Sequence, residues 1–328
     1  MSTTTTAVSV VGAVAPVTRR VRAYFAPVNR VAGTPTVFDA AQMGAFALDT
    51  PPAPWADLGW CSGFARKSET KVGVLTTGAP AVVQAQVRTQ VEASVQLEFE
   101  SWGKLQLALT AGSQQMNLLK TTSGAAPNGS GGVAEMAVPL QAGSTATSLN
   151  VGATAAAQFH VGDLVVVDVD YVAQVGFVGC GVSAAYVSSA AAVGSDINYV
   201  RRVSLNVGRV VAIASGVLQL GEALLAGAPS AGMQVSSLVG FVDREGGGFF
   251  QEWSGLFVMD GEQGDRVIYH YPRLQTMHGS AETVETLAGP LGRVRLDGMF
   301  RALPVKDTND GETVLCFRSY LPGAMRAV

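Results

Sequence analysis

Hydrophobic and polar residues alternate without interruption along residues 87–99, VRTQVEASVQLEF. Apolar residues and one threonine occupy the odd positions, and arginine, glutamine, glutamate and serine occupy the even positions. A period of two is typical of a strand with one face in a core and the other in water. The stretch is about twice as long as the usual strand of ~5–6 residues. We therefore expect a long ribbon whose polar face has a purpose of its own.

The residues that follow this ribbon predict a helix, and the C-terminal part predicts further strands. Trp102, Leu105 and Leu109 recur at positions i, i+3 and i+7 of SWGKLQLALTAGSQQMNLL, with Ser101 available as a cap, which predicts a helix of two to three turns. Strand patterns return in SGLFVMD, DRVIYHYPRL, GRVRLDGMFRALP and TVLCFRSYL. The fold class predicted is mainly β: a β-sandwich or barrel-forming domain with one flanking helix.

A segment of low charge interrupts this domain. Ionisable side chains are sparse between residues 121 and 242, and Gly-rich linkers border the segment, TTSGAAPNGSGG at 121–132 and DREGGG at 243–248. Inside it, HVGDLVVVDVD and NVGRVVAIASGVLQLGEAL predict a small antiparallel unit, while VSAAYVSSAAAVGSDINYV fits either a loop or a small helix. We predict a domain split into 1–120 and 243–328, with an inserted all-β domain at 121–242.

Composition narrows the class of protein. Only 14% of the 328 residues are charged and 48% are hydrophobic, which suits a β-rich chain that hides much of its surface in partners. The net charge of −3 argues against a basic nucleic-acid binder, and no apolar run is long enough to span a membrane. Basic residues follow the apolar N-terminal run rather than precede it, and Cys61, Cys180 and Cys316 are odd in number. Both observations favour an intracellular product with reduced thiols.

Catalytic chemistry has little support in the sequence. His270 and His278 flank YPRLQTM but lack a third metal ligand at matching spacing, and His160 stands alone. GCGVSA at 179–184 matches a dinucleotide-binding pattern, but its surroundings predict antiparallel strands rather than a βαβ unit. Glu282 and Glu285 lie in a polar stretch typical of solvated carboxylates. We expect no enzyme activity, catalytic residue, cofactor or metal site.

The outer parts of the chain resemble the tail tube (major tail) protein family of tailed bacteriophages. The resemblance depends on the order of several pieces: PWADLGWCSGF, the polar stretch ARKSETKVGVLTTGAP, the long ribbon, the helix LQLALTAGSQQMNLL, and then VIYHYPRL and LDGMFRALP. It covers about residues 15–120 and 245–325. Residues 121–242 have no counterpart in the minimal pattern of the family.

The resemblance implies stacked rings in which sheets from several copies close a barrel around passing DNA. The family implies sixfold or pseudo-sixfold rings, a number that one chain does not reveal. The ribbon would then line the bore, with its polar side chains facing the lumen: Arg88, Gln90, Glu92, Ser94, Gln96 and Glu98. Uncharged and acidic residues suit such a passage because basic contacts hold phosphate. The alternative is that this face belongs to an outer, solvent-facing sheet.

The polar stretch at residues 65–80 is predicted as a long loop that contacts the next ring, with Arg66, Lys67, Glu69 and Lys71 as its charged residues. An ordinary solvated loop is the alternative. The implied partners are further copies of the chain, tape-measure, tail terminator and baseplate or tip proteins, and viral DNA bound without sequence specificity. The implied location is the virion tail, assembled in the host cytoplasm.

Three other functions remain open from the sequence alone. A capsid decoration protein or a tail terminator would also be rich in β-structure, but neither explains a long ribbon that leads into a helix. A carbohydrate- or receptor-binding module would use the inserted segment, yet the aromatic residues there lie mostly inside apolar runs. The size of the insertion predicts a sheathless, non-contractile tail, because a sheath around the tube would leave no room for a domain on its outside.

Overall fold

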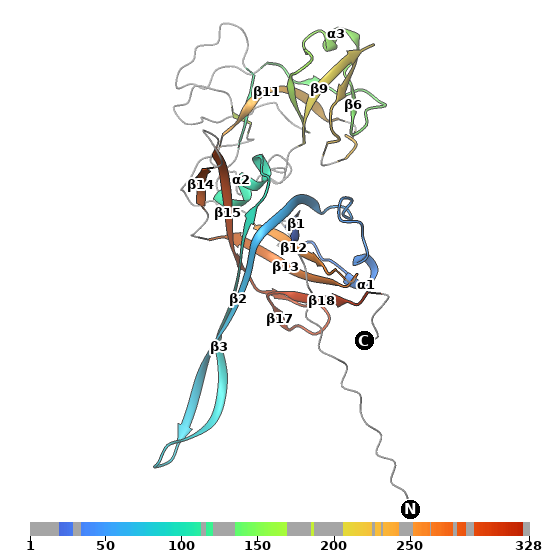
Figure 1. Ribbon diagram of the computed structural model, residues 1–328. Coiled ribbons are helices and arrows are strands. Elements are labelled where there is room, and N and C mark those ends of the chain that lie inside the picture. Colours follow the sequence, from blue (N-terminus) through green and yellow to red (C-terminus); the bar gives the residue numbers. More distant parts are fainter. Residues whose placement is uncertain are drawn as a thin grey trace, which may run out of the picture.

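The protein is mainly β, as the alternating patterns predict, and its strands form two large antiparallel sheets in the computed structural model (Figure 1). The description covers residues 20–28, 34–112, 116–120, 135–168, 185–186, 206–224, 227–230, 232–242, 252–262, 264–277, 281–286 and 292–323. None of the helices in these ranges has the length and apolar character that a membrane crossing requires.

The first sheet is built from both ends of the chain. Its strands are β1 (Val21–Pro27), β2 (Ala56–Thr77), β3 (Val82–Phe99), β12 (Glu252–Asp260), β13 (Arg266–Thr276), β14 (Ala281–Thr286), β15 (Gly292–Ala302) and β18 (Phe317–Leu321). Their order is β14-β15-β3-β2-β1-β12-β13-β18, and β13 also pairs with β15. This last pairing closes β15, β3, β2, β1, β12 and β13 into a barrel, with β14 and β18 as the two end strands. A small hairpin of β16 (Val305–Lys306) and β17 (Thr313–Val314) precedes β18.

Alternating apolar residues of these strands fill the barrel. Val95, Leu97 and Phe99 of β3 are buried against Phe257 of β12 and Phe300 of β15. Each of these residues occupies one of the alternate apolar positions of its strand. Because alternate side chains point to the same side, the pattern in the sequence determines which face turns inward. Full burial of one such side chain contributes about 1.5–3 kcal/mol, which makes this cluster the main source of stability in the first sheet.

The predicted helix is present with the predicted two to three turns, but it begins later than expected. Helix α2 (Lys104–Ala111) covers one end of the barrel and buries Leu105 and Leu109, as expected. Its cap is Gly103 rather than Ser101, because the side chain of Gln106 accepts the Gly103 N–H at 2.9 Å. Trp102 lies before the helix. The helix ends at Gly112, whose φ of 58° is in the left-handed region that favours glycine.

Strands β2 and β3 are 22 and 18 residues long and continue past the barrel as a two-stranded ribbon (Figure 1). In β3 every residue from Val82 to Glu92 is exposed, and burial begins at Ala93. We call the projecting part, residues 69–92, the arm. The prediction of a long loop at 65–80 was wrong, because only residues 78–81 form a turn. The β-branched residues Thr70, Val72, Val74 and Thr76 recur at every second position of β2, which pairs with β3 almost to its end.

The second sheet lies within residues 116–242. Its path is β6 (Ser148–Asn150), β10 (Val217–Leu220), β9 (Val207–Ala214), β7 (Leu164–Asp168), β11 (Gln234–Val242), β4 (Met116–Leu119) and β8 (Ala185–Tyr186), with β5 (Val138–Pro139) also on β11. Helix α3 (Ala153–Ala156) packs beside β10. The sheet has a hydrophobic core of its own, which includes Leu149, Val165, Val210 and Leu218.

The inserted segment begins earlier than the border predicted at residue 121, because β4 joins the second sheet. Its register places Met116 directly opposite Val242, so the first and last strands of this unit start and finish side by side. That geometry is what an insertion into a host domain requires. The two predicted linkers, the GCGVSA pattern and Cys180 lie outside the described residues. Of the ambiguous segment VSAAYVSSAAAVGSDINYV, only β8 is described.

Residues 34–55 cover the outer face of β1, β12 and β13. Helix α1 (Ala40–Met43) is capped by the Asp39 carboxylate, and an aromatic cluster of Phe38, Trp55 and Tyr24 packs beneath this segment. His270 of β13 joins the cluster and is buried. Its Nε2 lies 3.2 Å from the carbonyl oxygen of Thr36, so the neutral ring donates there. Burial lowers the pKa of His270 to about 4.

This histidine should make stability depend on pH. The folded pKa lies below the unfolded value of about 6.5, so as the pH falls from about 6.5 to about 4 only the unfolded chain takes up the proton. The free energy of unfolding should fall by up to about 3 kcal/mol across that window. Urea denaturation at several pH values measures it. A His270→Phe variant should lose this component of the slope, whereas His160→Gln at an exposed site should retain it. Equal slopes in all three proteins would contradict the assignment.

Candidate functional site

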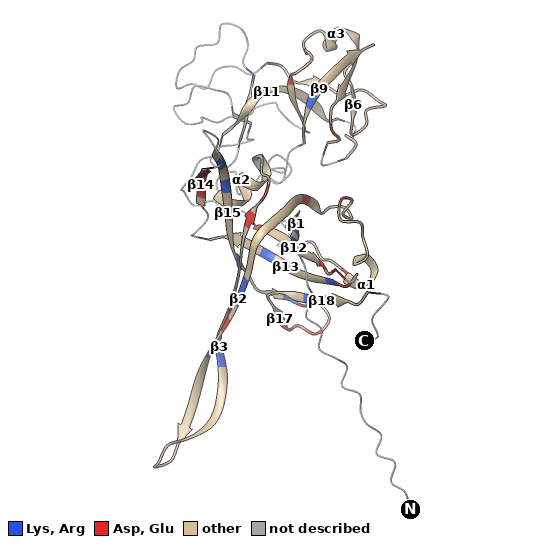
Figure 2. Cartoon of the chain, in the orientation of Figure 1, with Lys and Arg blue, Asp and Glu red and all other residues tan. Residues whose placement is uncertain are grey.

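The tip of the arm is apolar and carries no charge. Residues 72–87, VGVLTTGAPAVVQAQV, contain no acidic or basic side chain, and Figure 2 shows this end of the ribbon without blue or red. Val72, Leu75, Val82, Val83 and Val87 are each between 47% and 63% exposed. A two-stranded ribbon alone is at best marginally stable in water, and a concentrated apolar surface of this kind marks an interaction site.

The base of the arm has one polar face. Residues opposite each other in an antiparallel pair share a face, and the register pairs Lys67 with Ser94, Glu69 with Glu92 and Lys71 with Gln90. Lys67 forms an ion pair with Glu69, and Gln90 donates to Glu92. Arg301 and Met277 lie beside this face in a small cavity of about 150 Å³. The face therefore mixes both signs of charge with amides and hydroxyls.

This arrangement places most of the predicted lumen residues together. Gln90, Glu92, Ser94 and Gln96 occupy alternate positions of β3 in unbroken register, and Glu92 and Gln96 are exposed. Three residues predicted for the stacking loop, Lys67, Glu69 and Lys71, lie on the same face, but on strand β2 rather than in a loop. Whether this face lines a bore or contacts another ring stays a prediction.

Arg88 does not belong to the polar face. The register steps from Lys71 opposite Gln90 to Val72 opposite Arg88, which leaves Thr89 as an extra residue in β3. Such a bulge reverses which face the following residues occupy. Arg88 consequently lines a pocket with Val91 on the other face of the ribbon. The alternation in the sequence is unbroken at this point, so it gave no sign of the bulge.

Glu98 was also predicted to face water, and this was wrong. It is 8% exposed, and both of its carboxylate oxygens accept hydrogen bonds from Arg295, with Nε at 2.6 Å from Oε1. Arg293 lies 3.7 Å from the same carboxylate. Glu98 lies opposite Asp297 of β15 in the barrel wall. The two arginines belong to the same polar, alternate positions of β15 as Asp297. The negative charge of Glu98 is therefore compensated by arginines of the same chain.

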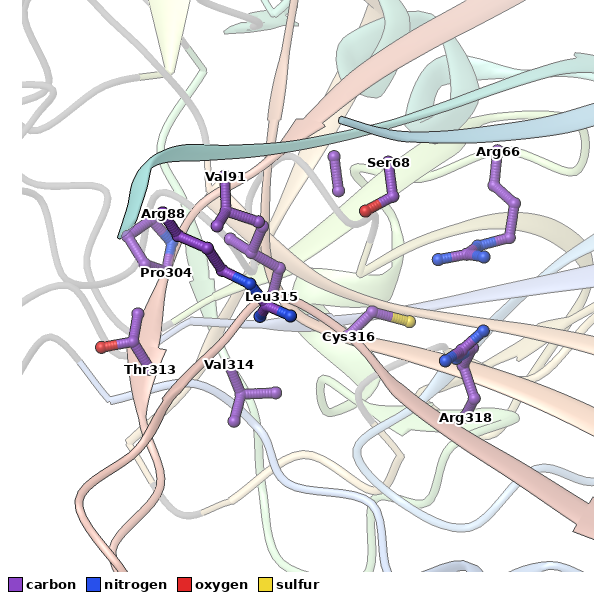
Figure 3. Close-up of a pocket in the computed structure, with 11 residues that line it drawn as sticks. Arg66, Ser68, Arg88, Val91, Pro304, Thr313, Val314, Leu315, Cys316 and Arg318 are labelled. Atoms are coloured by element: carbon purple, nitrogen blue, oxygen red, sulfur yellow. The ribbon is translucent and has the colours of Figure 1, made fainter. Parts of the chain in front are cut away.

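The pocket on the opposite face of the arm base brings together three arginines from three places in the sequence (Figure 3). It has a volume of about 550 Å³ and is lined by Arg66, Ser68, Arg88, Val91, Ala93, Pro304, Thr313, Val314, Leu315, Cys316 and Arg318. Arg66 was predicted for the stacking loop, but it lies on β2 and points to this side. Arg318 was not foreseen, because β18 reaches the arm base only through the barrel topology.

The remaining polar groups of this pocket favour binding rather than catalysis. Nε of Arg66 donates to the Tyr271 hydroxyl at 3.1 Å, and burial raises the pKa of Tyr271 to about 12. Burial also raises the pKa of the Cys316 thiol, although Arg66 and Arg318 oppose that shift. Both groups are thus protonated near neutral pH, and the thiol is a poor nucleophile. The pocket presents fixed positive charge to whatever enters it.

Metal chemistry finds no support in the described residues, where no group of three or more histidines, cysteines or acids is placed to hold an ion. His270 is buried in the aromatic cluster, while His278 lies outside the described residues. Glu285 pairs with Arg293 at 2.9 Å, and Glu282 is exposed. No protein-family model matches the sequence, and no curated protein matches it either.

The two glutamates of β3 should respond differently to charge reversal. Glu98→Lys places a third positive charge beside Arg293 and Arg295 in a nearly buried position, which should lower the free energy of unfolding by roughly 3 kcal/mol. Glu92→Lys, on the exposed polar face, should change it by no more than about 0.5 kcal/mol. Urea denaturation of the two variants beside wild type measures both effects. Equal losses would contradict the assignment of Glu98 to the barrel wall.

Proposed function

We propose that this chain is a structural, non-enzymatic subunit that assembles with copies of itself into the tube of a phage tail. The observation that carries the proposal is the arm: a ribbon too long for its barrel, apolar at its tip and without a covering layer among the described residues. An uncharged projection of this kind is stabilised when another protein covers it. In a repeating assembly that cover comes from the next copy, so each arm reaches from one ring to its neighbour.

The polar face at the arm base supports a DNA passage. Gln90, Glu92, Ser94 and Gln96 supply amides, a hydroxyl and a carboxylate, and the lysines of β2 are balanced there by Glu69 and Glu92. Arg301 beside them leaves one basic side chain in excess, and a lining so close to balance offers phosphates little net attraction, because affinity for DNA grows with each uncompensated basic contact. The bulge at Thr89 also supports a DNA passage, because it places Arg88, the one predicted basic residue of β3, on the other face of the ribbon.

The inserted unit supports a tail without a sheath. The unit has its own core and leaves the barrel through adjacent strands, β4 and β11. In a tube it can occupy neither the bore nor the contact between rings, so it projects outward where a contractile sheath would lie. Its low charge favours packing on neighbouring copies. Tape-measure, terminator and tip proteins remain the partners expected at the inside and ends of such a tube.

Shortening the arm should prevent tube growth. Replacing residues 72–89 with Asn-Gly joins Lys71 and Gln90, which face each other in the register, through a two-residue turn. The barrel should fold, because its core residues are untouched, and the protein should stay as monomers or single rings. Negative-stain microscopy and sedimentation measure the outcome. Gln86→Ser, which keeps the apolar surface of the arm, serves as the control. Normal tubes from the shortened protein would contradict a role for the arm in stacking.

Removing the inserted unit should thin the tube without abolishing it. Residues 113–251 are replaced by a flexible Gly/Ser linker, which removes β4 together with the rest of its sheet. Tubes should still form, with a smaller diameter and a lower dissociation temperature, because the outward contacts are lost. Microscopy gives the diameter and light scattering during heating gives the temperature. An unchanged diameter would place the unit elsewhere, and a sheath protein on native tubes would contradict the sheathless proposal.

A further inference from the structure

Most arginines of the barrel domain are paired with carboxylates of the same chain. The ion pairs are Arg22–Asp57, Arg266–Asp260, Arg273–Glu252, Arg293–Glu285 and Arg295–Glu98. The three arginines of the pocket at the arm base differ. Arg88 and Arg318 have no hydrogen bond or ion pair with any described residue. Arg66 donates to the Tyr271 hydroxyl and lies over the ring of Tyr269, but it pairs with no described carboxylate. No described carboxylate compensates their positive charge.

The lining of the pocket indicates the class of ligand. No described acidic side chain lines it, so the three guanidinium groups repel one another until an anion enters. Guanidinium forks match a carboxylate through paired hydrogen bonds. Val91, Pro304, Val314 and Leu315 form the rest of the wall and suit aliphatic side chains beside that carboxylate. These features together favour a protein segment over the phosphates of nucleic acid, as does the net charge of −3.

Strand β14 carries such a segment. Glu282 is exposed and has no hydrogen bond or ion pair with any described residue. Val284, two positions along on the same face, is 74% exposed, and it lies opposite Val294 of β15, which is also exposed. Trp102 borders this patch through a hydrogen bond from Nε1 to the Val294 carbonyl oxygen at 3.0 Å. An uncompensated carboxylate thus stands among exposed apolar side chains, which matches the arginines and apolar wall of the pocket.

The two features belong to opposite ends of one sheet. β14 and β18 are the first and last strands in the order of the first sheet. Glu282 lies on β14, and Arg318 lies on β18. Neither end strand has a further hydrogen-bonded neighbour in the described sheet. A contact between β14 of one copy and the pocket of another is therefore heterologous, and it repeats from copy to copy into a ring or an open helix.

We propose that the carboxylate of Glu282 from one copy of the chain binds in the pocket formed by Arg66, Arg88 and Arg318 of the next copy. This inference rests on the proposed function, because it names the contact through which the subunits of one layer recognise each other. The arm then joins layers, while Glu282 and the arginine pocket join neighbours within a layer. The exposed valines of β14 are covered in the same contact.

Charge reversal on both sides tests the pairing. Glu282→Arg should raise the protein concentration needed for assembly at least about tenfold, because like charges then meet in the interface. Arg88→Glu combined with Arg318→Glu should do the same, while Arg66 stays because it contacts Tyr271 in the barrel. A chain that carries all three changes should assemble near the wild-type concentration. Sedimentation velocity measures assembly, and circular dichroism confirms that each variant is folded.

A matched control and two contrary results complete the test. Asp49→Arg reverses an exposed carboxylate of the segment 34–55, which takes part in neither proposed contact, and should leave assembly unchanged. Normal assembly by both Glu282→Arg and the Arg88→Glu, Arg318→Glu double variant would overturn the pairing. If wild type still forms tubes in that case, the proposed function stands. If the reversed pocket abolishes binding of a short DNA duplex and Glu282→Arg assembles normally, the pocket binds phosphate and the proposal fails. A wild-type protein that stays monomeric at every concentration would overturn both proposals.

Discussion

The pairing of β2 with β3 is the interaction on which the rest of the first sheet depends. One half of this ribbon forms barrel wall, where Val95, Leu97 and Phe99 enter the core, and the other half continues into solvent as the arm. The two halves share one ladder of hydrogen bonds, so the rigid barrel fixes the direction of the arm. A projection held in this way has less freedom to lose on binding than a loop of the same length, which favours its use in contact.

Charge is distributed according to where it can be compensated. Glu98 is held within the barrel wall by Arg295, whereas the polar face of the arm base balances its lysines with Glu69 and Glu92. The tip of the arm has no charge, and the arginine pocket has charge of one sign only. The first two arrangements are complete in a single chain. The last two are incomplete, and they are the surfaces that we assign to neighbouring copies.

Periodicity in the sequence predicted the elements where one face of a strand meets a core. Leu296 and Phe300 of β15 and Leu105 and Leu109 of α2 are buried as the patterns indicate, and β12 and β13 lie where strands were expected. The bulge at Thr89 was not predictable, because it depends on the register with β2 and leaves no mark in the alternation. Arg66 and Arg88 share one face of the β2–β3 ribbon because of that bulge, and Arg318, far away along the chain, reaches them only through the barrel. The loop predicted at 65–80 is strand because β-branched residues recur at every second position from Thr70 to Thr76, a pattern that the charged residues before them obscure.

The position of the inserted unit also sets an order of folding during synthesis. Strands β1–β3 are complete at Phe99, but β12, which must pair with β1, begins only at Glu252, so about 150 residues are made in between. At roughly 5–20 residues per second, this interval lasts on the order of 10–30 seconds. During that time the second sheet can complete all its pairings, while one edge of β1 and the apolar arm wait for partners. The unit that looks like an addition to the barrel is therefore the first part of the chain able to finish folding.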